Sequence, residues 1–310
     1  MRAIVTGGAG FIGSHLVDAL VARGDDVVVL DNFATGRRER LNAGARLAEV
    51  DIREGEAVRA AFDAHPPEVV FHLAAQADVR VSVEDPAFDA TVNVLGTIQI
   101  LEAARAAGAR VVFSSTGGAI YGECEEPAAE DGGLEPLSPY GASKLAAEEY
   151  LWMYGRLHGT RHVALRFGNV YGPRQDPHGE AGVVAIFFGR LADGEPPRIF
   201  GDGRQTRDYV YVGDVVDATL AAAGTERGGV FNVGTGRETS VLELAEACMR
   251  VSGIELQPVF EPGRLGELQR SVLDTRRTAE VLGTRAATSL DEGLAATWRS
   301  VEGASAHGAN

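Results

Sequence analysis

Residues 3–14, which read AIVTGGAGFIGS, decide the fold of this chain. A short apolar run typical of a strand leads into a cluster of glycines, and apolar residues at helical spacing follow. Gly7, Gly10 and Gly13 are spaced three residues apart, and the segment also fits the Gly-x-Gly-x-x-Gly pattern of dinucleotide-binding turns. Glycines in such a turn adopt positive φ, let a pyrophosphate approach the backbone and allow the helix to pack closely on the strand. We therefore predict a strand, a nucleotide-binding turn and a helix.

A second apolar run, residues 27–30, ends in Asp31, eighteen residues after Gly13. A carboxylate at this place accepts hydrogen bonds from the adenosine ribose and repels a 2′-phosphate. The preceding helix N-terminus offers N–H groups and a partial positive charge to the phosphates. We therefore expect NAD rather than NADP as the cofactor, and we interpret Arg37 and Arg38, beyond the strand, as solvated loop charges.

The composition is that of an ordinary globular protein, with 310 residues of which 45% are hydrophobic and 24% charged. The net charge of −15 disfavours nucleic acid and anionic membrane surfaces as partners. No apolar stretch approaches the roughly 20 residues that cross a bilayer, and glycines interrupt the N-terminal run, which disfavours a signal peptide. Cys124 and Cys248 are too few for a disulfide framework or a zinc site, so we expect a cytoplasmic protein without a metal.

Strand-like and helix-like segments alternate from the N-terminus to about residue 165. This alternation predicts the α/β class, a Rossmann-type doubly wound parallel sheet with helices on both faces. Ligands of such sheets bind beyond the carboxyl ends of the strands. Besides the two strands above, we expect strands at residues 46–50, 69–73, 110–114 and 162–167, and helices at 56–64, 86–107 and 138–158.

The sequence changes character after about residue 169, where loops rich in Gly, Pro and charge alternate with short elements. Residues 207–223 have the apolar content of a core strand and helix and are expected to return to the first domain. We predict an NAD-binding domain, a smaller discontinuous C-terminal substrate lobe and a short tail, with disorder from about Gly303. Their expected ranges are 1–168 with about 207–233, about 169–206 with 234–300, and 301–310.

Tyr140 and Lys144 lie four residues apart in a helical stretch, so they share one face. A lysine charge about 4 Å from a phenol contributes on the order of 4 kcal/mol at an effective dielectric constant near 20. That energy lowers the phenol pKa from about 10 by up to about three pH units. The phenolate can then take a proton from an alcohol near neutral pH. A surface pair is the better interpretation of these residues alone, and the nucleotide-binding turn reverses that preference.

Three hydroxyl residues, Ser114, Ser115 and Thr116, follow the end of a predicted strand. A hydroxyl there can bond the same substrate oxygen as Tyr140 and relay its proton, whereas turn chemistry would explain the same residues without catalysis. We choose Thr116 as the catalytic hydroxyl, with Ser115 as the alternative.

Taken together, these motifs resemble the extended short-chain dehydrogenase/reductases, and within that family the chain is most similar to the UDP-glucose 4-epimerases. The resemblance runs from about residue 1 to 290. It is carried by TGGAGFIGSH (6–15), DN (31–32), DI (51–52), HLAAQ (72–76), SST (114–116), YG (121–122), PYGASK (139–144), RFGNVYGPR (166–174), GDG (201–203) and TRDYV (206–210).

The resemblance implies roles for residues that match the family motifs. The implied substrate contacts are Thr116, Tyr140, Asn169, Arg207, Arg264 and Glu267, of which Asn169 and Arg207 would hold the nucleotide diphosphate. The implied NAD contacts are Gly7, Gly10, Phe11, Ile12, Gly13, Asp31, Asn32, Asp51, Ile52, Leu73, Ala74, Ala75, Gln76, Asn93, Ser114, Tyr140 and Lys144.

The implied reaction interconverts UDP-glucose and UDP-galactose. Tyr140 would take the O4 proton as C4 gives hydride to NAD, and the hydride would return to the opposite face of a transient 4-keto sugar. Ser271 falls near a family position where a small side chain favours N-acetylated sugars as well. Family members usually dimerise through the Tyr140 helix and the helix within residues 93–107, so a homodimer is expected.

Other readings of the same motifs stay open. Gly117 and Gly118 stand where sugar-nucleotide 4,6-dehydratases carry an Asp-Glu pair, which disfavours dehydration. A UDP-glucuronate 4-epimerase or decarboxylase shares every cofactor motif. A non-catalytic NAD-binding regulator would be marked by loss of the Tyr140–Lys144 pair, which this chain retains.

Overall fold

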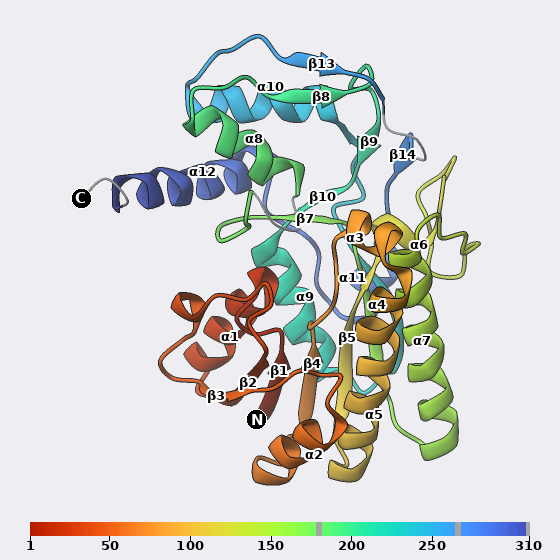
Figure 1. The fold of residues 1–310 in the computed structure, drawn as a ribbon. Helices are drawn as coiled ribbons and strands as arrows, with labels where there is room; N and C mark the ends of the chain where they lie inside the picture. Colours follow the sequence, from red (N-terminus) through yellow and green to blue (C-terminus); the bar gives the residue numbers. More distant parts are fainter. Residues whose placement is uncertain (178–181, 264–267, 308–310) are drawn as a thin grey trace.

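The central sheet is built from parallel strands in the order β11-β6-β5-β4-β1-β2-β3 (Figure 1). The structure is a computed structural model, and it describes residues 1–177, 182–263 and 268–307. The predicted Rossmann-type α/β fold is confirmed. The strands are β1 (Arg2–Thr6), β2 (Asp26–Asp31), β3 (Arg46–Glu49), β4 (Val69–His72), β5 (Arg110–Thr116), β6 (Val163–Phe167) and β11 (Gly229–Val233).

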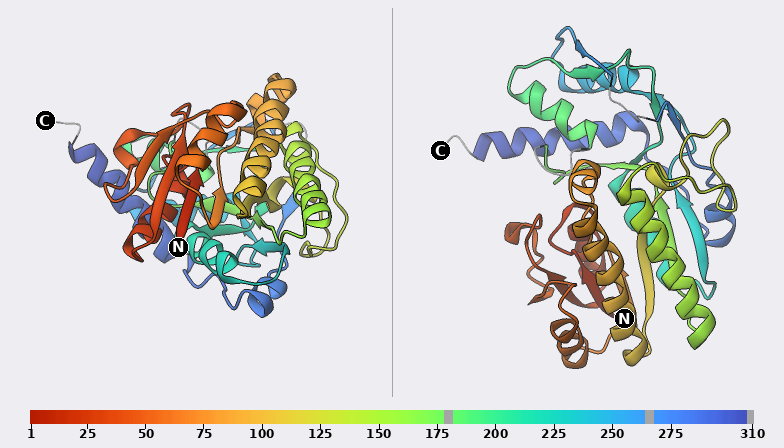
Figure 2. Two further views of the ribbon diagram at one scale, coloured as in Figure 1. Left: turned by 90° about the horizontal axis from the view of Figure 1, so that it is seen from below. Right: turned by 45° about the vertical axis from the view of Figure 1, so that its right-hand side comes forward.

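Helices cover both faces of this sheet, as Figure 2 shows. One face packs on α1 (Phe11–Ala22) and α9 (Val212–Gly224), and the other on α2 (Gly55–Ala64), α5 (Gly96–Ala107) and α7 (Pro139–His158). Neighbouring strand residues point to opposite faces, so Val5 joins the first core and Ile4 the second. Burial on both faces explains why β1, β2 and β4 read as continuous apolar runs, whereas the edge strand β3 is largely exposed.

The predicted helix 86–107 is divided in three by a π-helical turn. The segments are α4 (Pro86–Ala90), the turn Thr91–Leu95, labelled η2, and α5. Such π turns recur at functional sites, and this one carries Asn93. Shorter helices also flank the carboxyl edge of the sheet, namely α3 (Val79–Glu84), α6 (Gly117–Ile120) and the 3-10 turn η1 (Arg38–Arg40).

A third hydrophobic core belongs to the elements that lie above the carboxyl ends of the strands in Figure 1. Its centre includes Phe187, Phe188, Leu244 and Trp298, and we call the surrounding elements the second lobe. These elements are β7 (Asn169–Tyr171), β8 (Arg198–Phe200), β10 (Tyr209–Tyr211), β13 (Val259–Glu261), α8 (Val183–Ala192), α10 (Val241–Ser252) and α12 (Leu290–His307). A small sheet of β9 (Thr206–Arg207), β12 (Thr239–Ser240) and β14 (Arg270–Ser271) lies beside them.

Two segments differ from their expected placement. Helix α12 extends to His307, so the expectation of disorder from about Gly303 is wrong for 303–307. Val301 packs on the third core, and the alanines that follow it in the sequence favour helix. Helix α11 (Arg276–Val281) packs on β11, although its sequence lies within the range assigned to the substrate lobe. The division of the chain into lobes therefore remains a prediction.

Asp208 lies where β9 meets β10, and it links the central sheet to the second lobe. Its buried carboxylate accepts hydrogen bonds from the Thr235 backbone N–H and hydroxyl, each at 2.7 Å, and from the Gly236 N–H at 2.9 Å. Burial raises the pKa of this carboxyl, and the hydrogen bonds from Thr235 oppose that effect. The carboxylate thus fixes the crossing point between the sheet and the second lobe.

Candidate functional site

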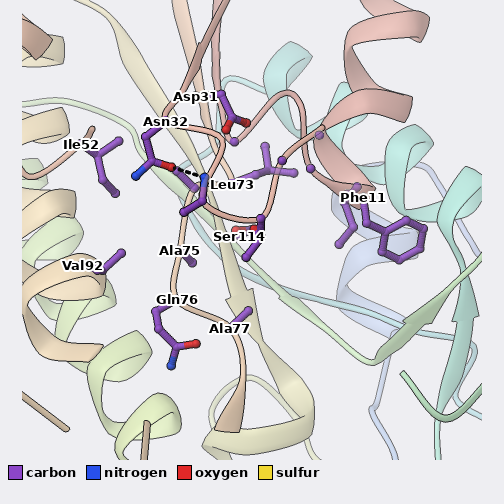
Figure 3. A pocket seen from close by; sticks show the side chains of 18 of the residues that line it. Phe11, Asp31, Asn32, Ile52, Leu73, Ala75, Gln76, Ala77, Val92 and Ser114 are labelled. Carbon is purple, nitrogen blue, oxygen red and sulfur yellow. Dashed lines mark hydrogen bonds between the residues drawn. The ribbon is translucent and has the colours of Figure 1, made fainter. Parts of the chain in front are cut away.

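A cavity of about 800 Å³ lies at the carboxyl edge of the sheet, where the loops after β1, β2, β4 and β5 converge. In the view of Figure 3, Asp31 and Asn32 lie at one end and Gln76 at the other, with Leu73 and Ser114 between them. Most of the predicted cofactor residues line it. They are Gly7, Gly10, Phe11, Ile12, Gly13, Asp31, Asn32, Asp51, Ile52, Leu73, Ala74, Ala75, Gln76, Ser114, Tyr140 and Lys144.

The glycine turn depends on the absence of side chains at two positions. Gly7 has a φ of 69°, and a Cβ there would lie 2.7 Å from the backbone nitrogen of Ala74. A Cβ at Gly13 would lie 2.1 Å from the Gly7 carbonyl oxygen, closer than any side chain permits. The turn therefore packs against both the loop after β4 and the first turn of α1, which leaves the start of α1 facing the cavity.

Acidic and amide side chains lie at the end of the cavity that is expected to hold the adenosine ribose. Asp31 accepts the N–H groups of Ala9 at 2.9 Å and Phe33 at 2.8 Å, which fixes its carboxylate at the cavity wall. Asn32 donates to Asp51 at 2.9 Å. The hydrogen bond from Arg53 lowers the pKa of Asp51 to about 2. These carboxylates keep acceptor lone pairs that suit ribose hydroxyls.

His72 supports the cavity floor through a chain of hydrogen bonds. The Ala74 N–H donates to Thr6 Oγ1, which lies 2.7 Å from His72 Nδ1, and His72 Nε2 lies 3.0 Å from Thr97 Oγ1. Thr97 in turn donates to the Asn93 carbonyl, which assigns the proton of the imidazole to Nε2. Burial, with the nearby Lys144 charge, lowers the pKa of His72 to about 3. The histidine is therefore a neutral structural residue.

Asn93 lies behind the cavity wall and does not line it as expected. Its side chain accepts the Gln76 N–H and donates to the Gln76 carbonyl, both at 2.9 Å, and it also donates to Ser143 on α7. The π turn brings this amide against the loop after β4. Its contribution to the cofactor site is therefore to hold Gln76, which is itself at the wall.

Tyr140 and Lys144 both line the cavity from the first turns of α7. The Lys144 ammonium, only 2% exposed as a residue, donates to the Ser114 carbonyl at 2.9 Å. It lies 4.7 Å from the centre of the Phe113 ring and 6.0 Å from that of Tyr140. A cation is thus held in a buried place beside a phenol at the cofactor cavity.

The three hydroxyls at the end of β5 have different surroundings. Ser114 donates to the His72 carbonyl at 3.1 Å, and Ser115 donates to the Glu148 carboxylate on α7. Ser115 borders the cavity, whereas Thr116, which is also buried, is not among its lining residues. Adjacent residues on a strand point to opposite faces, so Ser115 alone is directed at Glu148.

Of the predicted substrate residues, Tyr140 lines the cofactor cavity, whereas Asn169 and Arg207 are not among its lining residues. Asn169, in β7, has its side-chain oxygen beside Gly118, where a Cβ would approach it to 3.3 Å. Arg207, in β9, pairs with Ser271 of β14 and Thr239 of β12. The structure thus brings Asn169 near the end of β5, and it puts Arg207 in the small sheet. Arg264 and Glu267 lie outside the described residues.

Sequence reasoning missed one part of the cavity wall. Phe167, Gln175, Asp176, Arg37 and Arg40 also line it. Arg37, interpreted above as a solvated loop charge, forms an ion pair with Asp176 across the wall. The sequence signal that could have found this wall is Arg-Gln-Asp at residues 174–176, because it continues directly from the family motif at 166–174.

Two negative observations apply to the described ranges. Within residues 1–177, 182–263 and 268–307, no three His, Cys, Asp or Glu side chains are grouped as metal ligands would be. The helices of the same ranges include none with the length and apolar character of a bilayer span.

A glycine turn, an acidic residue ending β2 and a Tyr–Lys pair on α7 together define a nucleotide-dependent short-chain dehydrogenase/reductase. The family model described as "NAD dependent epimerase/dehydratase family" matches residues 3–234. The chain belongs to that family, and the predicted NAD cofactor is confirmed at the level of the family.

One curated relative and two crystal structures are similar to this chain over nearly its whole length. A curated UDP-glucose 4-epimerase of Mycolicibacterium smegmatis is 51% identical over 304 residues, which cover 96% of this chain and 97% of the relative. A crystal structure of UDP-glucose 4-epimerase with UDP-glucose from Thermotoga maritima has a TM-score of 0.96 and 47% identity, covering 98% and 99% of the two chains. A complex of the Thermus thermophilus UDP-glucose 4-epimerase with NAD has a TM-score of 0.93 and 48% identity, covering 98% and 100%.

Proposed function

We propose that this protein is an NAD-dependent 4-epimerase that interconverts UDP-glucose and UDP-galactose. The observation that carries the proposal is the buried Lys144 ammonium beside the Tyr140 phenol, both at the wall of the cofactor cavity. The 51% identity to a UDP-glucose 4-epimerase over nearly the whole chain supports the choice of sugar. Nothing outside these residues and the bound cofactor is required, because an epimerisation has no net oxidation.

The residues present fit NAD. The glycine turn leaves no room for a Cβ at Gly13, the start of α1 faces the cavity, and Asp31 offers carboxylate oxygens where a ribose diol is expected. Asn32, Asp51 and Ile52 would bind the adenosine end, and Leu73 to Gln76 the middle of the cofactor. Bound NAD supplies a hydride acceptor that can also return the hydride.

Tyr140 holds and moves the proton in this proposal. Its phenolate oxygen takes the proton from the sugar O4 while C4 is oxidised, and gives it back when the 4-keto sugar is reduced on its other face. Lys144 stabilises the phenolate with its positive charge. We assign the second hydrogen bond to O4 to Thr116, because the Ser115 hydroxyl is already donated to Glu148.

The substrate has to be held firmly at its nucleotide and loosely at its sugar. Asn169, Arg207, Arg264 and Glu267 are proposed to bind the UDP portion. A tight grip on either face of the sugar would stabilise one ground state without lowering the barrier, so the site should make few contacts there. Ser271 is a small residue that pairs with Arg207 in the small sheet, and on its size we propose UDP-N-acetylglucosamine as a second substrate.

The test is to incubate the purified protein with UDP-glucose, UDP-N-acetylglucosamine and UDP-glucuronate and to resolve the C4 epimers by chromatography. UDP-galactose from UDP-glucose is the expected product. Tyr140→Phe should lower kcat by roughly 10²- to 10⁴-fold without releasing NAD, the range for loss of acid–base catalysis. Tyr150→Phe, on the exposed side of the same helix, is the matched control. A protein that binds NAD and leaves every sugar unchanged would instead be a regulator.

We also propose a homodimer formed through the outer faces of η2, α5 and α7. These helices pack side by side, as the right view of Figure 2 shows, and they expose Leu95 (54%) and Leu157 (68%) to solvent. Light scattering after gel filtration should give twice the chain mass of 32.7 kDa. Leu95→Glu with Leu157→Glu should give the monomer mass, because a charge in an apolar interface is costly to bury.

A further inference from the structure

We propose that residues 173–176, between β7 and α8, form part of the NAD site and slow the release of the cofactor. The inference rests on the proposed function only in taking NAD as the ligand of the cavity. It assigns binding to a segment at the end of the family motif that lies outside the expected cofactor residues. The evidence comes from both walls of the cavity and from the contacts that join them.

The first wall is the loop after β2. A Cβ at Gly36 would lie 2.7 Å from an Asp31 carboxylate oxygen, so this loop is packed against the expected ribose ligand. The backbone N–H of Arg37 donates to the Ala9 carbonyl of the glycine turn at 3.0 Å. Arg37 and Arg40 both line the cavity from this loop.

The second wall is the segment after β7, where Gln175 and Asp176 line the same cavity. Gln175 donates to the Val170 carbonyl at 3.1 Å, which holds the segment against β7. Arg174 has a φ of 68°, so the chain turns sharply there. This turn directs Arg174 toward α1 and Asp176 toward the loop after β2.

Four contacts hold the second wall in place, two with the loop after β2 and two with α1. Asp176 forms an ion pair with Arg37, and Arg40 donates to the Arg174 carbonyl at 2.6 Å. The Arg174 guanidinium pairs with Asp18 on α1 at 2.7 Å. His15, also on α1, lies with Nε2 2.9 Å from the Pro173 carbonyl oxygen, and burial lowers its pKa, so a neutral ring donates from Nε2.

Each contact is partly exposed, so each alone would contribute little free energy to holding the segment in place. Together they attach one short segment to both parts of the nucleotide cradle, the helix whose N-terminus faces the cavity and the loop packed on Asp31. A cofactor in the cavity is covered on this side until the contacts separate. The segment therefore contributes to holding NAD through a catalytic cycle that needs the cofactor to stay bound.

The experiment measures NAD release from the full-length protein. The variant carries Arg174→Asn, since asparagine tolerates positive φ, and Asp176→Asn, so the net charge is unchanged. Released NAD is trapped with alcohol dehydrogenase and excess ethanol, and NADH fluorescence is followed with time. We expect release roughly tenfold faster than from the parent, because several small contacts are lost together.

The matched control is Arg250→Asn with Asp291→Asn, which removes an exposed ion pair between α10 and α12 with the same charge balance. It should release NAD at the parent rate. Equal release from the 174/176 variant and the parent would overturn the proposal, as would equally fast release from the control. The readout does not need turnover, so a protein that holds NAD without epimerising UDP-glucose would contradict the proposed function while the release rates still decide this one.

Discussion

Glu148 and Arg166 form an ion pair at 2.7 Å in which the side chains are 1% and 3% exposed. The pair joins α7 to β6, and Ser115 on β5 donates to the same carboxylate. Arg166 also donates to the Tyr121 hydroxyl at 2.8 Å, which in turn donates to Asn232 on β11. Helix α7, which carries Tyr140 and Lys144, is thus attached to three neighbouring strands by one buried polar network.

Glu148→Gln should lower the free energy of unfolding by roughly 3–5 kcal/mol, because Arg166 is left as a buried charge without its counterion. Urea unfolding followed by circular dichroism measures the change. Asp291→Asn, which breaks the exposed pair with Arg250, should change it by at most about 1 kcal/mol. An unchanged midpoint for Glu148→Gln would show that the network is not needed for stability.

The roles of Ser115 and Thr116 can be distinguished by removing each hydroxyl and measuring both kcat and stability. Thr116→Val should lower kcat by about 10²-fold, the lower end expected when a hydrogen bond in acid–base catalysis is lost. Ser115→Ala should leave kcat nearly unchanged and cost about 1 kcal/mol of stability, because it removes one donor from Glu148. Kinetics with UDP-glucose and urea unfolding give the two numbers. The reverse pattern would assign the catalytic hydroxyl to Ser115.

Gly13→Ala should prevent NAD retention, because its Cβ would lie 2.1 Å from the Gly7 carbonyl oxygen and would push α1 away from the turn. Absorbance of the purified protein near the NAD band after gel filtration measures the retained cofactor. Gly133→Ala, where no atom lies within 4 Å of the added Cβ, should retain NAD like the parent. Full retention by Gly13→Ala would contradict a steric requirement at the turn.

Stability should decrease with acidity because two histidines are buried in the neutral form. Burial lowers the pKa of His72 to about 3 and that of His162 to about 4. Unfolded histidines titrate near 6.5, so between these values the unfolded state binds protons that the folded state does not. The stabilisation is complete above about pH 6.5 and is lost as the pH falls.

The expected slope below about pH 6 is about 1.4 kcal/mol per pH unit for each histidine. Urea unfolding at about pH 7.5 and about pH 5 gives the difference, and His162→Asn should reduce the slope by about half. Equal stability at the two pH values would mean that neither imidazole is excluded from its proton in the folded protein.

The fold and the cavity floor were predictable because they follow from local patterns with steric causes. Gly7 is required by its contact with the loop after β4 and Gly13 by its contact with the Gly7 carbonyl, and Asp31 ends a strand that is visible in the sequence. The same holds for the Tyr140–Lys144 pair, whose shared face depends on helical spacing alone. These are short-range relationships, and a single sequence contains them.

What the sequence did not reveal depends on contacts between distant residues. Arg37 and Asp176 are 139 positions apart, and Ser115 and Glu148 are 33 apart, so neither partner could be assigned from spacing. The π turn at Asn93 is stabilised by hydrogen bonds to Gln76 and Ser143 from other segments. Residues 301–307 belong to a helix whose Val301 packs on the third core, and composition alone does not reveal that contact.

The carboxylate of Asp208 has a consequence for how the molecule responds to heat. Because Asp208 directly precedes β10 of the second lobe and its carboxylate bonds the loop that follows β11 of the sheet, we expect the two cores to lose their native contacts together. A differential scanning calorimeter should accordingly record one heat-absorption peak, with a calorimetric enthalpy equal to the van't Hoff value.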